Sequence, residues 1–318
     1  MQISVVIPSK NGLLHLKECL PSVVQAAGQA RDEVRIVVVD DHSTDGTAQE
    51  FSRLFPTVFY CQNEGFGAGD ARNTGVKAFA CDWIVFLDND VLVDPDFFNT
   101  LGFYLKPDLF CVTCAGYKVH PTSGSQPRQL DGIKLISWKK GFPRFDKNIF
   151  NSTLPQTHQT PYPSYGIQGA YFACNRSCFD QLNGFDPLFS PYMLEETDLM
   201  YRGLKRGWKI VYAPDTAPLH KWGSTIHSKT NQTTRFLSKR NRILFVWKNI
   251  TDKKLLFNHG LWMLMRPTPV ALWACIRLWP QIRRARAQQL KNSILTDRTI
   301  LSGSHDLFKT LRERKKCK

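Results

Sequence analysis

The sequence predicts an α/β protein built around a mainly parallel sheet. Short apolar runs of strand length alternate with stretches whose apolar residues recur at helical spacing. Two of the apolar runs end directly in acidic residues, at positions 40–41 and 88–90. The 318 residues are 42% hydrophobic and 22% charged, which is an ordinary globular composition.

The expected elements follow one another in a repeating order of strand and helix. We expect strands at residues 3–8, 34–39, 58–60, 83–87, 110–119, 166–174 and 209–212. We expect helices at residues 12–27, 47–54, 70–80, 96–105, 177–182 and 195–206. This order is typical of parallel strands with helices on both faces, so both acidic groups should face one crevice at the C-terminal edge of the sheet.

Residues 120–164 differ in composition from the rest of the chain. They are rich in Pro, Gly, Ser and Thr, with aromatic residues such as Trp138 between them. A connection of this length is usually functional or mobile. Its aromatic side chains either contact a sugar or flexible substrate or pack the loop against the domain.

Charge and cysteine content limit the functional classes. The net charge is +15, and the basic excess falls mainly after residue 235, which indicates an anionic partner such as lipid or nucleic acid, or a solubilising terminus. The nine cysteines show no zinc or redox spacing beyond a single C-x-x-C at 111–114, which favours a reducing compartment. No secretory signal is expected at the N-terminus, because no basic and apolar leader precedes the first strand.

Three groups of polar residues are candidates for chemistry. Asp88 and Asp90 offer the hard oxygen ligands that Mg²⁺ or Mn²⁺ prefers, although acids are also common in turns. The glycine-rich loop 65–69 opens a helix and suits a diphosphate, with Arg72 beside it, or is a simple tight turn. Residues 195–198 place three acids in one helical turn, more than capping alone requires.

Seven short motifs stand in a fixed order along the chain. They are VVIPSKN at 5–11, VDDHSTDGT at 39–47, ARNTG at 71–75, DND at 88–90, GFD at 184–186, EETDL at 195–199, and GW at 207–208 followed by His220. With these motifs, residues 2–250 resemble the inverting glycosyltransferases of family 2, which have the GT-A fold. The GFG at 65–67 is similar to rhamnosyltransferase-like members of the family.

The resemblance implies a domain organisation. A GT-A catalytic domain would cover residues 1–230, with a nucleotide-sugar-binding half at 1–119 and an acceptor half at 120–230. A basic, aromatic and helical C-terminal region would follow at 231–318.

The resemblance also assigns roles to individual residues. The donor site would comprise Pro8, Lys10, Asp40, Asp41, Gly67, Arg72 and Asp88, with the Asp40-Asp41 pair hydrogen-bonding the base. The Mg²⁺ or Mn²⁺ ion would be held by Asp90, Asp88 and His220, with Asp90 the direct ligand and Asp88 also holding the ribose. The general base would be Glu196, with Glu195 as the alternative, and the acceptor would contact Trp138, Asp198 and Trp222.

The implied reaction moves a sugar from a nucleoside-diphosphate sugar to a hydroxyl, with inversion at the anomeric carbon. The expected products are cell-surface polysaccharide or glycolipid, and the acceptor is a saccharide or is linked to lipid. The processive Q-x-x-R-W motif is missing, which favours transfer of one or a few sugars. Lys10 stands where the family usually has an aromatic residue, so stacking on the base is in question there.

The C-terminal region predicts contact with a membrane surface. No uninterrupted apolar run of about eighteen residues is present, so a membrane span is not expected. Trp262, Trp273 and Trp279 stand near Arg and Lys, as in helices that lie in the bilayer interface, although a packed helical cap gives the same pattern. We therefore expect a cytoplasmic enzyme at the inner face of the membrane, in peripheral contact with anionic lipid.

Other functional classes fit the sequence less well. A sugar nucleotidyltransferase should carry a glycine-rich loop with Arg and Lys directly after the first strand, which residues 8–12 do not provide. A nucleic-acid-binding protein that uses the basic tail leaves the acidic crevice unexplained, so no nucleic-acid partner is expected. A transferase fold that only binds is disfavoured by the intact acids at every motif.

Overall fold

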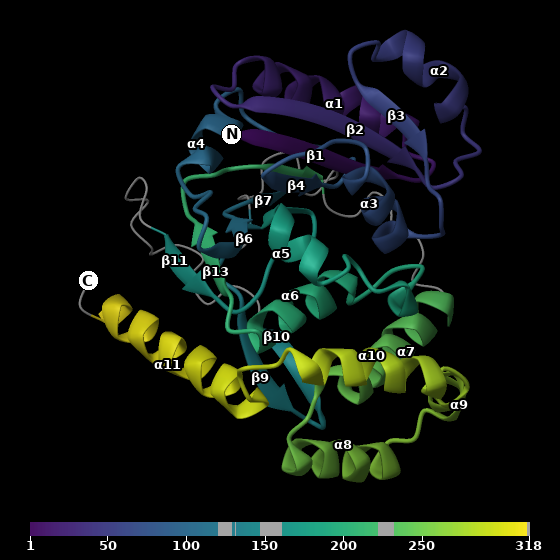
Figure 1. Cartoon of the computed structure of the whole chain (residues 1–318), viewed down its shortest axis with the longest axis vertical. Helices are drawn as coiled ribbons and strands as arrows, with labels where there is room; N and C mark the ends of the chain where they lie inside the picture. Colours follow the sequence, from purple (N-terminus) through teal and green to yellow (C-terminus); the bar gives the residue numbers. More distant parts are fainter. Residues whose placement is uncertain (120–128, 131, 147–160, 222–231, 317–318) are drawn as a thin grey trace.

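A large central sheet organises the chain. The computed structural model describes residues 1–119, 129–130, 132–146, 161–221 and 232–316 (Figure 1). The strands of the sheet, in chain order, are β1 (Gln2–Ser9), β2 (Glu33–Asp40), β3 (Phe59–Gln62), β4 (Trp83–Leu87), β6 (Leu109–Cys114), β11 (Tyr162–Ser164), β12 (Tyr171–Asn175) and β13 (Lys209–Ala213). Their spatial order is β11-β13-β6-β12-β4-β1-β2-β3.

Most pairings in the sheet are parallel. β1 lies between β2 and β4 and is parallel to both, while β12 is inserted antiparallel between β4 and β6. All five residues of β4 are buried, as expected for a central strand covered on both faces. The prediction of a mainly parallel α/β fold is therefore confirmed.

Helices cover both faces of the sheet because alternate residues of each strand point to opposite sides. Val6 and Ile84 belong to one apolar cluster and Val5 and Val85 to the other. The helices of this part are α1 (Leu13–Gly28), α2 (Thr47–Leu54), α3 (Ala68–Val76), α4 (Phe97–Gly102) and α5 (Arg176–Gln181). α3 can lie close to the sheet because a Cβ at Gly75 would stand 2.5 Å from a methyl of Val6.

A small second sheet brings distant segments of the chain together. The strand expected at 110–119 divides into β6 and β7 (Tyr117–Val119), which joins β5 (Val91–Leu92), β8 (Gln129–Leu130) and β14 (Leu219–Lys221). The chain can turn at Gly116 only because no side chain is there, since a Cβ would lie 2.1 Å from the Tyr171 ring. Within this sheet His220 pairs with Val91, directly after Asp90.

The C-terminal helices pack against the part of the chain that contains the central sheet and do not form a separate body. They are α6 (Glu195–Lys205), α7 (Gln232–Asn249), α8 (Lys253–Met265), α9 (Pro269–Arg277), α10 (Trp279–Lys291) and α11 (Asp297–Lys316). Apolar residues of α7 such as Leu244 and Phe245 share one buried cluster with α6 and with one face of the sheet. The last of these helices, α11, continues as far as Lys316.

The structure favours one alternative left open for residues 120–164 and shortens one expected strand. The segment 120–164 contains the hairpin of β9 (Leu135–Lys139) and β10 (Phe142–Asp146), and Phe142 is buried, so this hairpin is packed and not an open loop. The strand expected at 166–174 begins only at Tyr171.

Candidate active site

Two carboxylates and one imidazole meet at the end of the central strand. Asp88 follows β4, Asp90 precedes β5, and His220 lies on β14. One ligand atom from each of the three residues lies within 4.8 Å of the others, and His220 Nε2 is 3.2 Å from Asp90 Oδ1. The pairing of β5 with β14 therefore explains how a histidine 130 positions along the chain reaches the acids.

The donor atoms of this group fit a divalent cation. Burial alone lowers the pKa of His220, but the hydrogen bond and charge of Asp90 raise it above its ordinary value. His220 Nδ1 is buried and has no hydrogen-bond partner in the described part of the chain. Two carboxylates with an imidazole are ligands that suit Mn²⁺ or Mg²⁺, so the residues present match the expected metal.

Arg72 of α3 joins this group to a second pair of acids. Its Nη2 lies 2.9 Å from Asp88 Oδ1, and its Nη1 lies 3.2 Å from Glu196 Oε1 and 3.5 Å from Glu195 Oε1. Burial opposes the charge on Arg72, but the three carboxylates outweigh it and hold the arginine pKa above its ordinary value. Arg72 was expected along a phosphate, and the structure instead places it among carboxylates.

The glutamate pair begins α6 after an unusual stretch of backbone. Met193 and Leu194 have positive φ angles of 83° and 70°, a region that non-glycine residues rarely adopt. The side-chain amide of Asn241, on α7, donates hydrogen bonds to three carbonyls of this stretch, those of Phe189, Tyr192 and Met193. Backbone of this kind persists when its surroundings fix it, so Asn241 holds the turn that presents the glutamates.

The two glutamates differ in their surroundings. The Glu195 side chain is 6% exposed and that of Glu196 is 22% exposed. Burial, with the nearby charge of Glu196, raises the pKa of Glu195 to about 8, and its Oε2 has no hydrogen-bond partner among the described residues. Glu196 fits beside Gly169, where a Cβ would stand 2.4 Å from its Oε1. Glu196 is therefore the better placed of the two to meet a substrate.

The residues expected to bind the nucleobase lie together at the ends of β1 and β2. Pro8 is paired with Val39 near the end of β1, and Lys10 Nζ lies 3.0 Å from Asp41 Oδ2. The same ammonium lies 4.5 Å from the centre of the exposed Phe66 ring. The structure thus supplies an aromatic ring next to Lys10.

Asp40 lies behind Lys10 and Asp41. It is fully buried, and its Oδ2 accepts a hydrogen bond from the Tyr60 hydroxyl at 3.0 Å. Of the acidic pair, Asp41 is therefore the one nearer the crevice.

The glycine-rich loop has the geometry of a tight turn. Gly67 has a φ of 92°, and a Cβ there would stand 2.2 Å from the Pro191 carbonyl oxygen. The backbone N–H of Gly67 donates to Asp41 at 2.9 Å, and that of Ala68 donates to Pro191 at 2.9 Å. Because these amides already have partners, the loop presents none of them to a diphosphate, and the turn interpretation is favoured.

Two of the three residues expected to contact the acceptor, Asp198 and Trp138, have other partners in the structure. Asp198 is fully buried, with Lys248 Nζ 2.8 Å from both of its oxygens and Arg202 Nε 2.7 Å from Oδ2. Trp138 donates its indole N–H to Asn258 of α8 at 2.9 Å. Trp222 lies outside the described residues. Asp198 therefore joins α6 to α7, and we leave it and Trp138 out of the acceptor site proposed below.

Sequence reasoning missed two groups that shape the site. Asn241 and Lys248 act from α7, where the sequence offered only a basic amphipathic pattern. Gly169 makes room for Glu196, and its carbonyl accepts from Arg72 at 3.3 Å. The glycine was visible in the sequence, but nothing local indicated its neighbour.

Comparison with known proteins agrees with the fold and with the family resemblance. The model of Glycosyl transferase family 2 matches residues 4–182. The chain is 24% identical over 304 residues to an N-acetylglucosaminyl-diphospho-decaprenol L-rhamnosyltransferase of Mycobacterium tuberculosis, covering 87% of this chain and 93% of that protein. It is 33% identical over 103 residues to the glycosyltransferase GlyA of Streptococcus pneumoniae, of which it spans only 14%.

Two solved structures share the fold. GalNAc-T7 with UDP, GalNAc and Mn²⁺ has a TM-score of 0.60 at 21% identity, over 80% of this chain and 48% of that one. The mannosyltransferase PcManGT of Pyrobaculum calidifontis with GDP-Man and Mn²⁺ has a TM-score of 0.52 at 15% identity, over 91% and 84%. Since the family match covers more than half of the sequence, the chain belongs to glycosyl transferase family 2.

Proposed function

We propose that this glycosyltransferase is metal-dependent and inverting, and that it transfers a sugar from a nucleoside-diphosphate sugar to a hydroxyl of a saccharide or lipid-linked acceptor. The observation that carries the proposal is that one buried arginine, Arg72, joins a metal-type group to a glutamate pair. The solved structures with UDP, GalNAc and Mn²⁺ and with GDP-Man and Mn²⁺, and the relative named for a decaprenol-linked substrate, support the same chemistry. Cell-surface polysaccharide or glycolipid is the product class that fits.

The donor half of the site would bind the nucleotide and the cation. Asp90, His220 and Asp88 would hold Mg²⁺ or Mn²⁺, which when bound neutralises charge on the departing diphosphate. Asp41 and Lys10 line the corner where the nucleobase would sit. The exposed ring of Phe66 could stack on that base in place of the aromatic residue the family usually has at the Lys10 position.

The acceptor half would supply the base. Glu196 takes the proton of the acceptor hydroxyl while the acceptor oxygen bonds to the anomeric carbon. The bond from that carbon to the diphosphate oxygen breaks on the opposite face. One displacement of this kind inverts the configuration. Arg72 orients the more exposed Glu196 across a 3.2 Å contact, whereas Glu195 is more buried and, with a pKa of about 8, is mostly protonated at neutral pH. This difference selects Glu196 over Glu195.

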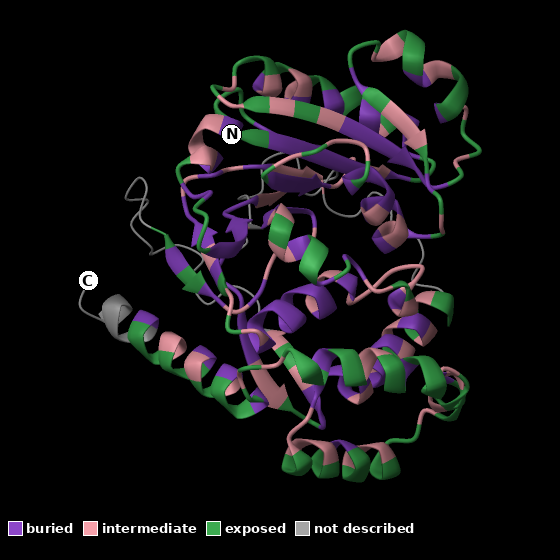
Figure 2. Ribbon diagram, viewed as in Figure 1, coloured by how far each residue is buried: buried purple, intermediate pink, exposed green. Residues whose placement is uncertain are grey.

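We also propose that α8 and α9 rest on an anionic membrane. No described helix is both long and apolar enough to cross a bilayer. Of the fifteen exposed large hydrophobic side chains in the described chain, eight lie between residues 257 and 279, and four of these lie on α8 at the spacing of one helix face. Figure 2 shows α8 as mostly exposed. Arg266 and Arg277 flank this apolar surface, and Arg277 lies 4.2 Å from the Trp273 ring centre. Exposed apolar area bordered by cations fits anionic lipid.

A donor screen tests the proposed function. Thermal shift and transfer assays with UDP-, GDP- and dTDP-sugars, with and without Mn²⁺, should find one donor whose binding needs the metal. Asp90→Ala should lose this metal-dependent binding, while Glu196→Gln should bind the donor and lose transfer. Glu64→Gln, at an exposed glutamate paired with Lys77, is the matched control and should behave as wild type. Transfer by Glu196→Gln at the wild-type rate would place the base elsewhere.

A further inference from the structure

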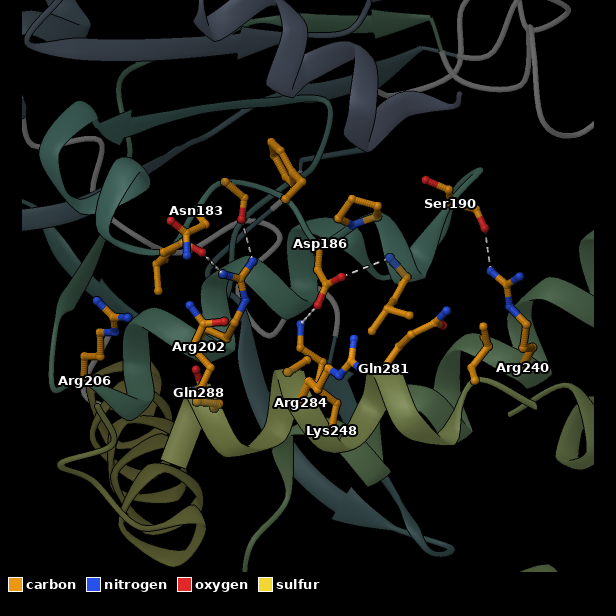
Figure 3. A pocket seen from close by; sticks show the side chains of 18 residues that line it. Asn183, Asp186, Ser190, Arg202, Arg206, Arg240, Lys248, Gln281, Arg284 and Gln288 are labelled. Carbon is orange, nitrogen blue, oxygen red and sulfur yellow. Dashed lines mark hydrogen bonds and ion pairs between the residues drawn. The ribbon is translucent and has the colours of Figure 1, made fainter. Parts of the chain in front are cut away.

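A cleft separate from the carboxylate site opens between α10 and the segment that connects α5 to α6. Its volume is about 650 Å³, and it is lined by Arg206 and Arg240 and, from α10, by Arg284 and Gln289. Figure 3 shows Arg206 and Arg240 at opposite ends of the cleft. The cleft shares no lining residue with the carboxylate site. The buried Phe185 stands between them, because it lines the cleft and its ring centre lies 5.6 Å from Arg72 Cζ.

The side chains that line the cleft are strongly cationic. Five are Arg or Lys and one is acidic, Asp186. Arg202 and Lys248 are compensated, because both pair with the buried Asp198 and Lys248 also pairs with Asp186. The charge left over therefore belongs to the other three cations.

Those three arginines have no carboxylate within ion-pair distance in the described chain. Arg206 donates to the carbonyl of Gln181 at 3.1 Å, and Arg240 donates to the carbonyl of Ser190 at 2.6 Å, so both meet only neutral oxygens. Burial lowers the pKa of both side chains, which means that their charge is incompletely solvated. Arg284 is exposed on α10 and projects toward the opposite wall (Figure 3).

Two buried donors in the cleft also lack acceptors. Gln289 is 5% exposed, and its Nε2 has no hydrogen-bond partner among the described residues. Arg206 Nε is also buried and has no hydrogen-bond acceptor among the described residues. Buried polar groups of this kind are normally satisfied, so their grouping in a cationic cleft indicates a ligand that accepts hydrogen bonds.

We propose that this cleft binds a phosphate or diphosphate group, with Arg206 and Gln289 donating from inside and Arg284 closing over it from α10. Arginine forks suit phosphate oxygens, and the buried setting strengthens each charge-assisted hydrogen bond. The group belongs either to a soluble phosphate compound or to a phospholipid headgroup at the membrane face. The proposal does not depend on the sugar-transfer reaction, because the cleft lies apart from the carboxylate site.

Calorimetric titration of the full chain with inorganic diphosphate, at constant ionic strength and with EDTA present, tests the proposal. EDTA removes metal-assisted binding at Asp88 and Asp90, whose charges then repel the anion. Wild type should bind, and the double variant R206Q/R284Q should bind at least about tenfold more weakly. Arg283→Gln is the matched control, because it removes one exposed charge from the same helix outside the cleft and should bind like wild type.

A second arm separates the two sources of phosphate. The same variants are sedimented with phosphatidylcholine vesicles containing phosphatidic acid. Given the loss of diphosphate binding, a matching loss in the vesicle arm that is specific to R206Q/R284Q, and not to Arg283→Gln, assigns the cleft to a lipid headgroup. Vesicle binding that R206Q/R284Q retains assigns the cleft to a soluble ligand. If R206Q/R284Q and Arg283→Gln match in both arms, with circular dichroism showing that both are folded, the proposal is overturned.

Discussion

Replacement of Glu195 by glutamine should stabilise the protein at and above neutral pH. Glu195 is 6% exposed, lies 3.5 Å from Arg72, and has one oxygen without a hydrogen-bond partner among the described residues. Burial raises its pKa from 4.5 to about 8. The unfolded chain releases this proton more readily than the folded chain, so folding becomes less favourable as pH rises through this window.

The size of the effect follows from the two pKa values. The contribution of Glu195 to stability is complete below pH 4.5 and is lost progressively up to pH 8. One group changes the free energy of unfolding by at most about 1.4 kcal/mol per pH unit. Between the two pKa values of Glu195 the free energy of unfolding therefore falls by at most about 5 kcal/mol. Because this figure is an upper bound and glutamine leaves an amide unmatched in the buried site, we expect a net gain of about 1–3 kcal/mol at pH 8.

Urea unfolding of wild type and Glu195→Gln at a series of pH values from 5 to 9 measures this difference. The wild-type curve should decline with pH more steeply than the curve of the variant. Glu196→Gln is the matched control, because it removes a neighbouring charge from the more exposed glutamate and should keep most of the slope. Transfer assays on the same proteins should show activity in Glu195→Gln and none in Glu196→Gln.

Parallel stability curves for wild type and Glu195→Gln would refute the reasoning. They would mean that the Glu195 carboxyl is solvated or fully compensated in the folded protein. Loss of transfer in Glu195→Gln, with transfer retained in Glu196→Gln, would exchange the roles of the two residues.

Three further predictions concern the C-terminal helices. Asn241→Ala should lower kcat for sugar transfer while donor KM stays near wild type, because the turn before α6 loses three hydrogen bonds, and steady-state kinetics measures both. Asp198→Asn should lower the free energy of unfolding by about 3 kcal/mol, measured in urea, because it leaves a buried lysine and arginine short of a counter-charge. The double variant L264S/W273S should bind anionic vesicles at least about tenfold more weakly in sedimentation, whereas Leu14→Ser, at an equally exposed leucine on α1, should bind normally.

Local pattern was enough to predict the sheet and the acids at its edge. Residues 83–87 are a continuous apolar run, and such runs are buried wherever they lie in a parallel sheet. Acids that follow these strands meet at one edge of the sheet because parallel strands have their carboxyl ends on the same side. No knowledge of contacts between distant residues is needed to predict this. The position of His220 came only from the family resemblance, and the pairing of β5 with β14 now explains it.

Contacts between distant segments could not be predicted in the same way. Arg72 meets Glu195 and Glu196 across more than 120 residues, and its partners depend on how α6 packs against α3. The family resemblance assigned Asp198 to the acceptor site, and Asp198 stands two residues after Glu196. On a helix, however, two residues turn a side chain to another face, and here that face is buried against α7.

The C-terminal helices are therefore part of the catalytic architecture and not an appendage to it. α7 holds the turn before the proposed base through Asn241, and it neutralises Asp198 of α6 through Lys248. α7 also packs against α9 and α10, which border the exposed apolar surface and the cationic cleft. A membrane or a phosphate group bound at α9 or α10 would therefore lie on helices that contact α7, the helix that holds the turn before Glu196. We infer that residue 231, where composition changes, does not mark a folding boundary, because the helix that follows it completes the core on which α6 rests.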